Sequence, residues 1–140
     1  MNLSEIVENY DKNIHGSFDE YFNDINYTIN KQVLDELHLD DIPLKQFLKK
    51  LKKYKYVEEV DDLKYGSFIR WIHLINPNNL RLNYSGIICS IKFTDEGTII
   101  SCKNLMNKYY TIKIDECLIF QKFTNDEENI INMVGDIYEN

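Results

Sequence analysis

A run of β-rich segments that begins at Tyr65 decides the fold of this chain. The segments read YGSFIRWIHLI (65–75), SGIICSIKF (85–93), GTIISCKN (97–104), KYYTIKID (108–115) and LIFQK (118–122). Each is rich in β-branched and aromatic residues, and a few turn-forming residues separate it from the next. No helical period interrupts them. The pattern predicts five short antiparallel strands.

The turns and the alternation of side chains predict how these strands close on themselves. Asp95-Glu96-Gly97 is typical of a tight hairpin, and Gly86 indicates a bulge or bend. Alternation assigns one face of each strand to the core, with Cys89, Ile91, Cys102 and Ile112 among its members. We therefore expect an α+β protein whose centre is a small SH3-like antiparallel β-barrel.

The residues before the strands predict helices near 3–10, 18–37 and 43–53, because apolar residues recur there at three- and four-residue steps. Ser17 and Glu20 form a capping-box pattern at the start of the second helix. The polar face of that helix, with Asn26 and Asn30, is expected to face water.

An acidic linker at 57–62 (VEEVDD) predicts a boundary between a helical region (1–57) and a second region (63–140). Thr124 and Glu127 form another capping-box pattern, followed by an amphipathic helix. We expect this C-terminal helix to pack over an open end or edge of the barrel.

Composition indicates one compact globular unit of 140 residues, 44% hydrophobic and 13% aromatic. No apolar run approaches the roughly 18 residues that cross a bilayer, and the N-terminus has no signal-peptide pattern. The three cysteines are far apart and suit neither a disulfide framework nor a zinc site. These features predict an intracellular protein that is not secreted and contacts no membrane.

Charge is distributed unevenly along the chain, although the net value is −7. Residues 1–42 hold ten acids and two bases, whereas 43–57 hold six lysines and no acid. The overall negative charge disfavours indiscriminate nucleic-acid binding, but the basic middle leaves local binding open.

No catalytic or cofactor motif is found in the sequence. His15, His38 and His73 are isolated, and no phosphate loop, HExxH or GxSxG pattern occurs. We therefore predict a protein that is not an enzyme and that uses no cofactor or metal.

Two groups of residues are candidates for a binding surface. The first is a lysine- and tyrosine-rich stretch that suits a phosphate backbone, or alternatively a solvated helix face that pairs with the acidic N-terminal helices. The second is a barrel face on which Trp71 is equally compatible with a core position. Their members are Lys49, Lys50, Lys52, Lys53, Tyr54 and Lys55 in the first group and Arg70, Trp71, Lys92 and Lys103 in the second.

Residues 63–138 resemble an uncharacterised family of small proteins encoded by nucleocytoplasmic large DNA viruses, the giant viruses. The most specific shared elements are FIRWI (68–72), CKN (102–104) and IFQK (119–122). The family has a paired glycine where this chain has Ser85-Gly86. The resemblance implies a viral setting, in the cytoplasmic viral factory or the virion, and no site residues.

The function expected from these observations is a non-catalytic interaction module that acts through protein–protein contacts, with a viral or host partner. The alternative is a nucleic-acid-binding accessory protein that uses the basic helix end and the barrel face.

Overall fold

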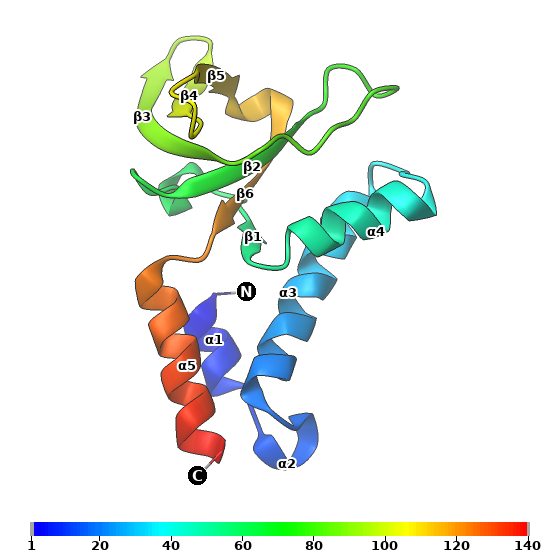
Figure 1. The fold of residues 1–140 in the computed structure, drawn as a ribbon, viewed down its shortest axis with the longest axis vertical. Helices are drawn as coiled ribbons and strands as arrows, with labels where there is room; N and C mark the ends of the chain where they lie inside the picture. The colour runs from blue at the N-terminus through cyan, green and yellow to red at the C-terminus, as the bar shows by residue number, and fades with distance from the viewer. Residues whose placement is uncertain (1, 140) are drawn as a thin grey trace.

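The computed structural model describes residues 2–139 and shows an α+β fold in which an antiparallel sheet lies above a group of helices (Figure 1). The helices are α1 (Leu3–Glu8), α2 (Lys12–His15), α3 (Phe18–Asp35), α4 (Asp41–Lys50) and α5 (Asn125–Glu139). The strands are β1 (Tyr54–Tyr56), β2 (Phe68–His73), β3 (Gly86–Thr94), β4 (Gly97–Lys103), β5 (Tyr109–Lys113) and β6 (Cys117–Lys122). Two single-turn 3₁₀ helices, η1 (Val60–Asp62) and η2 (Ile114–Glu116), complete the elements.

The sheet has six strands in the order β1-β6-β2-β3-β4-β5, and every pair is antiparallel. The five predicted strands are confirmed, but the expected closed five-stranded barrel is not. Within residues 2–139, β1 pairs only with β6 and β5 only with β4, so the sheet keeps two edges. The sixth strand, β1, directly follows the helix predicted near 43–53, in the region that the sequence predicted to be helical.

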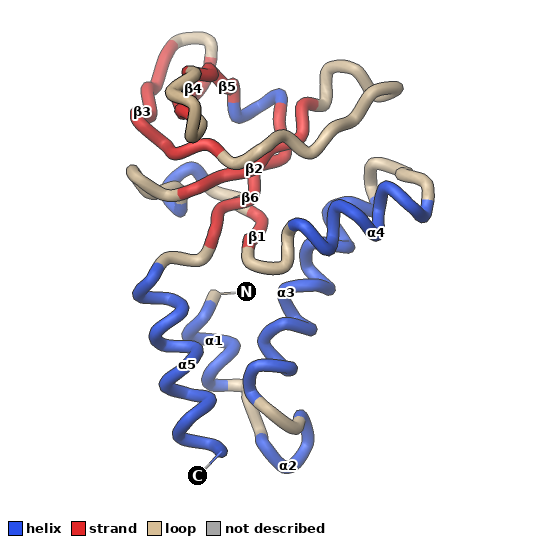
Figure 2. Tube along the Cα trace, in the orientation of Figure 1, coloured by secondary structure: helices blue, strands red, loops and turns tan. Residues whose placement is uncertain are grey.

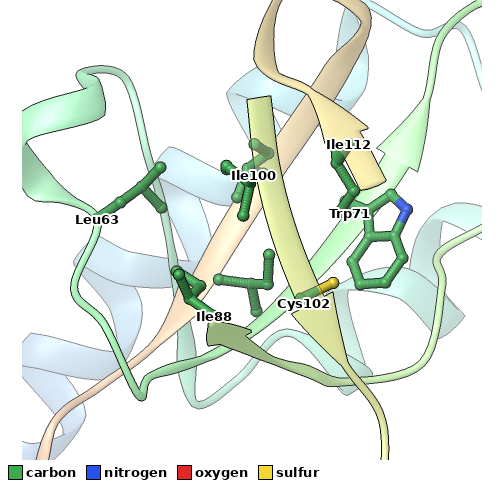
Figure 3. Close-up of a cluster of buried hydrophobic side chains, with 8 residues drawn as sticks. Leu63, Trp71, Ile88, Ile100, Cys102 and Ile112 are labelled. Atoms are coloured by element: carbon green, nitrogen blue, oxygen red, sulfur yellow. The ribbon is translucent and has the colours of Figure 1, made fainter. Parts of the chain in front are cut away.

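Strong curvature brings the far strands of this open sheet together around one core (Figure 3). Ile69 and Trp71 on β2 share a buried cluster with Ile100 on β4 and Ile112 on β5. The Trp71 ring lies 5.9 Å from the Tyr110 ring, so β5 folds back over β2. Clusters of this kind are the main source of stability in a small domain.

Gly86 allows this close approach. A Cβ atom at position 86 would lie 3.0 Å from Cys102 Sγ and 3.5 Å from the Trp71 ring. The bend is therefore permitted by a missing side chain, while the bulge itself occurs further along β3.

The bulge is at Cys89, and it corrects the predicted face of β3. Ile88 pairs with Cys102 and Ser90 with Ser101, which leaves Cys89 as the extra residue. Ile88 is therefore buried and Cys89 exposed, opposite to the alternation expected from the sequence. Beyond the bulge Ile91 packs against the core as predicted.

The linker after β1 packs closely against the sheet. Leu63 is buried in the sheet core, and Val57 and Val60 pack against it. The fully buried side chain of Gln121 donates to Asp62 O (3.0 Å) and accepts from Lys64 N (2.9 Å). One amide on β6 thus holds both the end of the linker and the chain that leads into β2.

The opposite face of the sheet packs on α3 and α4. Ile72 and Phe120, both fully buried, form a second cluster with Leu34 of α3, Leu48 of α4 and Leu51. This cluster joins helical and strand residues in one apolar contact.

The helices below the sheet form a third cluster, and α5 belongs to it. Phe22 of α3 lies 5.2 Å, ring to ring, from Phe123 at the start of the α5 segment, and Val134 of α5 is buried with them. The expectation that α5 covers the barrel is therefore wrong: α5 runs away from the sheet beside α1 and α3 (Figure 2). The apolar face of α5 packs against helices instead of strand edges.

Helix α4 stops three residues earlier than predicted. Its helical hydrogen bonds end at Leu51 N, which donates to Phe47 O (2.9 Å), and Tyr54 then pairs with Lys122 of β6. Strand pairing and burial of Tyr54 outweigh the helical preference of the surrounding lysines. The short helix α2 was not predicted either, because four residues carry no readable period.

Candidate interaction surfaces

The lysines of the first predicted group lie on two different surfaces. Lys49, Lys50, Lys52 and Lys53 are exposed at the end of α4 and in the turn that follows. Lys55 points elsewhere: its Nζ lies 2.7 Å from Glu127 Oε2 on α5. The alternative interpretation was that these lysines pair with acids of the N-terminal helices. Among residues 2–139, none of them forms such an ion pair.

Tyr54 and Trp71 are buried and are not part of an exposed surface. Tyr54 is 9% exposed, and its hydroxyl hydrogen bonds with Ser85 Oγ at 2.5 Å. Trp71 is 5% exposed within the sheet core. Neither ring is accessible for stacking on a base.

Of the remaining residues of the second group, Lys92 and Lys103 lie on the outer face of the sheet. Arg70 donates from Nε to Asn83 O (3.0 Å) and lies on β2. Lys92 and Lys103 lie on the outer face of β3 and β4, opposite the buried Ile100 and Cys102.

The structure adds neighbours to those two lysines. The register places Tyr109, Thr111 and Lys113 of β5 on the same face as Ser101 and Lys103 of β4. The residues of this outer sheet face are Ile87, Ser90, Lys92, Ile99, Ser101, Lys103, Tyr109, Thr111 and Lys113. Lys113 Nζ is 3.7 Å from Glu96 Oε2, an exposed contact that water screens.

A groove of about 930 Å³ lies between the helices within residues 2–139, and the sequence did not predict it. We call it the helical groove. Phe22, Phe123 and Ile6 form its buried floor, and half-buried aliphatic residues line its sides. Its lining within residues 2–139 is Asn2, Leu3, Ser4, Glu5, Ile6, Val7, Glu8, Phe22, Ile25, Asn26, Ile29, Lys55, Tyr56, Glu58, Asp62, Phe123, Glu127 and Ile130.

The charges of the helical groove are mostly negative. It contains five acids and one base, and the base, Lys55, is held by Glu127. Glu5, Glu8, Glu58 and Asp62 are exposed at its rim. Burial, with the nearby carboxylates of Glu58 and Glu36, raises the pKa of Tyr56 at the same rim.

Glu127, at the start of α5, forms hydrogen bonds with Thr124 and an ion pair with Lys55. Its N–H donates to Thr124 Oγ1, and its Oε1 accepts from Thr124 N, both at 3.1 Å, which is the reciprocal capping box predicted from the sequence. Burial acts to raise the pKa of Glu127, but hydrogen bonds from Lys55 and Thr124 with the Lys55 charge bring it below its ordinary value.

Two asparagines of α3 are buried where the sequence predicted a wet helix face, and Asn26 is part of the groove lining. Asn26 and Asn30 on α3 donate from Nδ2 to Tyr54 O, at 2.9 Å and 3.1 Å. They are 6% and 1% exposed. These two side chains of α3 thus donate hydrogen bonds to the backbone carbonyl of Tyr54, at the outer edge of β1.

The thiols of the chain differ in environment. Burial raises the pKa of Cys102 to about 11 and, with Glu116 nearby, that of Cys117 to about 12. Cys89 is exposed at the bulge of β3.

Residues 2–139 contain neither a metal-binding cluster nor a membrane-spanning helix. No three His, Cys, Asp or Glu side chains gather there in a way that suits a metal ion. None of the described helices combines the length and apolar character of a membrane span. Comparison of the chain with known protein families, with curated proteins and with solved structures finds no match.

Proposed function

We propose that this chain is a non-catalytic interaction module of a large DNA virus that acts through protein–protein contacts. The helical groove carries the proposal. Half-buried aliphatic side chains such as Ile25 and Ile29 line it, and Ile130 on its wall is 44% exposed. Apolar surface left in a rimmed groove is typical of a docking site. The viral setting rests on the resemblance of residues 63–138.

We also propose that the sheet is an open variant of the SH3-like arrangement. The strand order β6-β2-β3-β4-β5, with η2 immediately before β6, favours this reading. Such small sheets serve many unrelated proteins as binding scaffolds, so the arrangement by itself names no partner.

The proposal is tested by site-specific photocrosslinking in extracts of infected cells. A crosslinking residue at position 130 lies in the groove, whereas one at position 137, on the same helix and 68% exposed, lies outside its lining. We expect one protein to be captured at position 130 and absent at position 137. A chain recovered alone from both positions contradicts the proposal.

The outer sheet face favours a second candidate function, nucleic-acid binding. Three lysines, three hydroxyl side chains and Tyr109 on one face suit phosphate oxygens, although no tryptophan is available for stacking. The test is titration with single- and double-stranded DNA at two salt concentrations, for the protein and for Lys92→Glu/Lys103→Glu. Salt-sensitive binding lost in the variant supports this function, and its absence from the protein excludes it.

A further inference from the structure

We propose that the helical groove binds a lysine- or arginine-rich amphipathic helix of a partner protein. The inference rests on the proposed function and adds the chemistry of the partner. It follows from three features of the groove: its apolar sides, its acidic rim, and the helices that form its walls.

The apolar sides match one face of an amphipathic helix. Ile25 and Ile29 stand one turn apart on α3, with Ile130 of α5 as a further aliphatic contact. A helix with apolar residues at three- and four-residue steps presents a stripe that fits between such walls. Covering Ile130, now 44% exposed, contributes to the affinity.

The acidic rim selects the charge of that helix. Of the five acids in the lining, only Glu127 is in an ion pair among residues 2–139. Glu8 and Glu58 are exposed, and neither forms an ion pair within residues 2–139. Lysine or arginine residues flanking the apolar stripe of a partner would meet these carboxylates.

The walls favour a helix over an added strand. Helices α1, α3 and α5 contribute most of the lining, and helices pack into the grooves between other helices. Strand addition needs a free sheet edge. At β1, the strand in the groove, Asn26 and Asn30 occupy the Tyr54 carbonyl.

Two other ligand classes fit less well. A nucleic acid would bring phosphates against exposed carboxylates, which repel them. A small molecule is usually enclosed over about 70–90% of its surface, whereas the polar rim here, Glu5, Glu8, Glu58 and Asp62, is exposed to water.

The probe is a pair of designed peptides of about 18 residues, or roughly five helical turns. One contains only leucine at the apolar positions and lysine elsewhere, and the other replaces every lysine with glutamate. Fluorescence anisotropy of each labelled peptide is measured against the full chain at low and high salt. We expect the lysine peptide to bind, with affinity that falls as salt rises, and the glutamate peptide not to bind.

Charge reversal in the groove makes the test specific. Glu8 ends α1, where a lysine suits the helix dipole, and Glu58 lies in a loop, so Glu8→Lys/Glu58→Lys keeps the fold. It should weaken the lysine peptide roughly tenfold or more and allow the glutamate peptide to bind. The matched control, Asp24→Lys/Asp95→Lys, reverses two exposed acids outside the lining and should change neither affinity.

A variant of an apolar residue on the groove wall tests the apolar contact independently of charge. Ile130→Ser should weaken the lysine peptide several-fold, while Ile137→Ser, at an exposed position outside the lining on the same helix, should not. Circular dichroism of each variant confirms that the helices are retained.

Several results would overturn the inference. They are equal binding of both peptides, a lysine-peptide affinity indifferent to Glu8→Lys/Glu58→Lys, displacement of the peptide by DNA, or self-association of the chain through the groove. If the crosslink at position 130 still captures a protein that lacks a basic helix, the partner chemistry fails while the proposed function stands. If both fail, neither holds.

Discussion

Three buried amides show what the sequence could not reveal at the level of single residues. The polarity of Asn26 and Asn30 assigned them to the wet face of α3, although both continue the four-residue spacing of buried Phe22 and Leu34. They are buried because they satisfy backbone carbonyls of a strand that the sequence did not predict. Gln121 does the same for the linker. A polar residue that supports a hidden strand cannot be recognised before the strand is known.

Gln121→Leu should lower the free energy of unfolding by about 1–3 kcal/mol, because Lys64 N and Asp62 O lose their partner inside the protein. Denaturant titration measures the loss. Gln46→Leu, an exposed glutamine on α4, is the control and should change stability by less than about 0.5 kcal/mol. Equal effects at both positions would mean that the Gln121 hydrogen bonds contribute nothing.

The thiols should react in an order set by burial. With a pKa of about 11, Cys102 is a thiolate in only about one molecule per thousand at pH 8, and Cys117 in fewer. We expect a thiol reagent to modify Cys89 rapidly in the folded chain and the other two only after unfolding. Mass spectrometry of the labelled peptides gives the order, and rapid labelling of Cys102 would contradict the buried position.

Individual elements were predictable where a regular period was long enough. Five strands, α3, the Ser17 cap of α3 and the capping box at Thr124 follow from patterns of several residues. The strand β1 has only three residues and follows a lysine-rich helix end, and the bulge at Cys89 reverses the alternation in the middle of β3. The helical groove needed α5 to pack on α3, a contact between the two ends of the chain that no local pattern contains.

The start of α5 should make stability depend on pH. In the folded chain the pKa of Glu127 is below its ordinary value of 4.5, so the unfolded chain binds the proton more tightly. Its contribution is therefore complete above that value and is lost as pH falls through the folded pKa. Glu127→Gln keeps a capping side chain and removes the charge. It should cost about 1 kcal/mol near pH 7 and progressively less towards pH 3.

Chemical denaturation at several pH values gives that difference. Glu128→Gln is the control, because Glu128 is the next residue of the first turn and forms no ion pair among residues 2–139. A Glu127→Gln penalty that stays constant down to pH 3 would show that the ion pair with Lys55 does not stabilise the fold.

At the scale of the whole molecule, the three apolar clusters share elements. Helix α3 contributes Phe22 to one cluster and Leu34 to another, and β6 contributes Phe120 and Ile119 to two. The acidic linker therefore marks a change in residue composition, but it does not divide the structure into two separately packed parts. Leu63, which directly follows the linker, is itself buried in the sheet core.

The chain should unfold in one transition. Trp71 is the single tryptophan and reports on the sheet core, whereas circular dichroism reports mainly on the helices. Because Ile72 and Phe120 of the sheet are buried against Leu34 and Leu48 of the helices, we expect both signals to give one midpoint in denaturant. Two separate midpoints would show that helices and sheet fold independently.

The bulge at Cys89 has a consequence for insertions and deletions. Losing one residue from a strand normally sends every later side chain to the wrong face. Here Ile88 pairs with Cys102 and Ser90 with Ser101, so the two residues that flank Cys89 already pair with adjacent residues of β4. A chain without Cys89 would keep Ile91 inward and Lys92 outward, and would lose only the local bend. Position 89 is thus a place where natural variants can differ in length within a strand without changing which residues are buried.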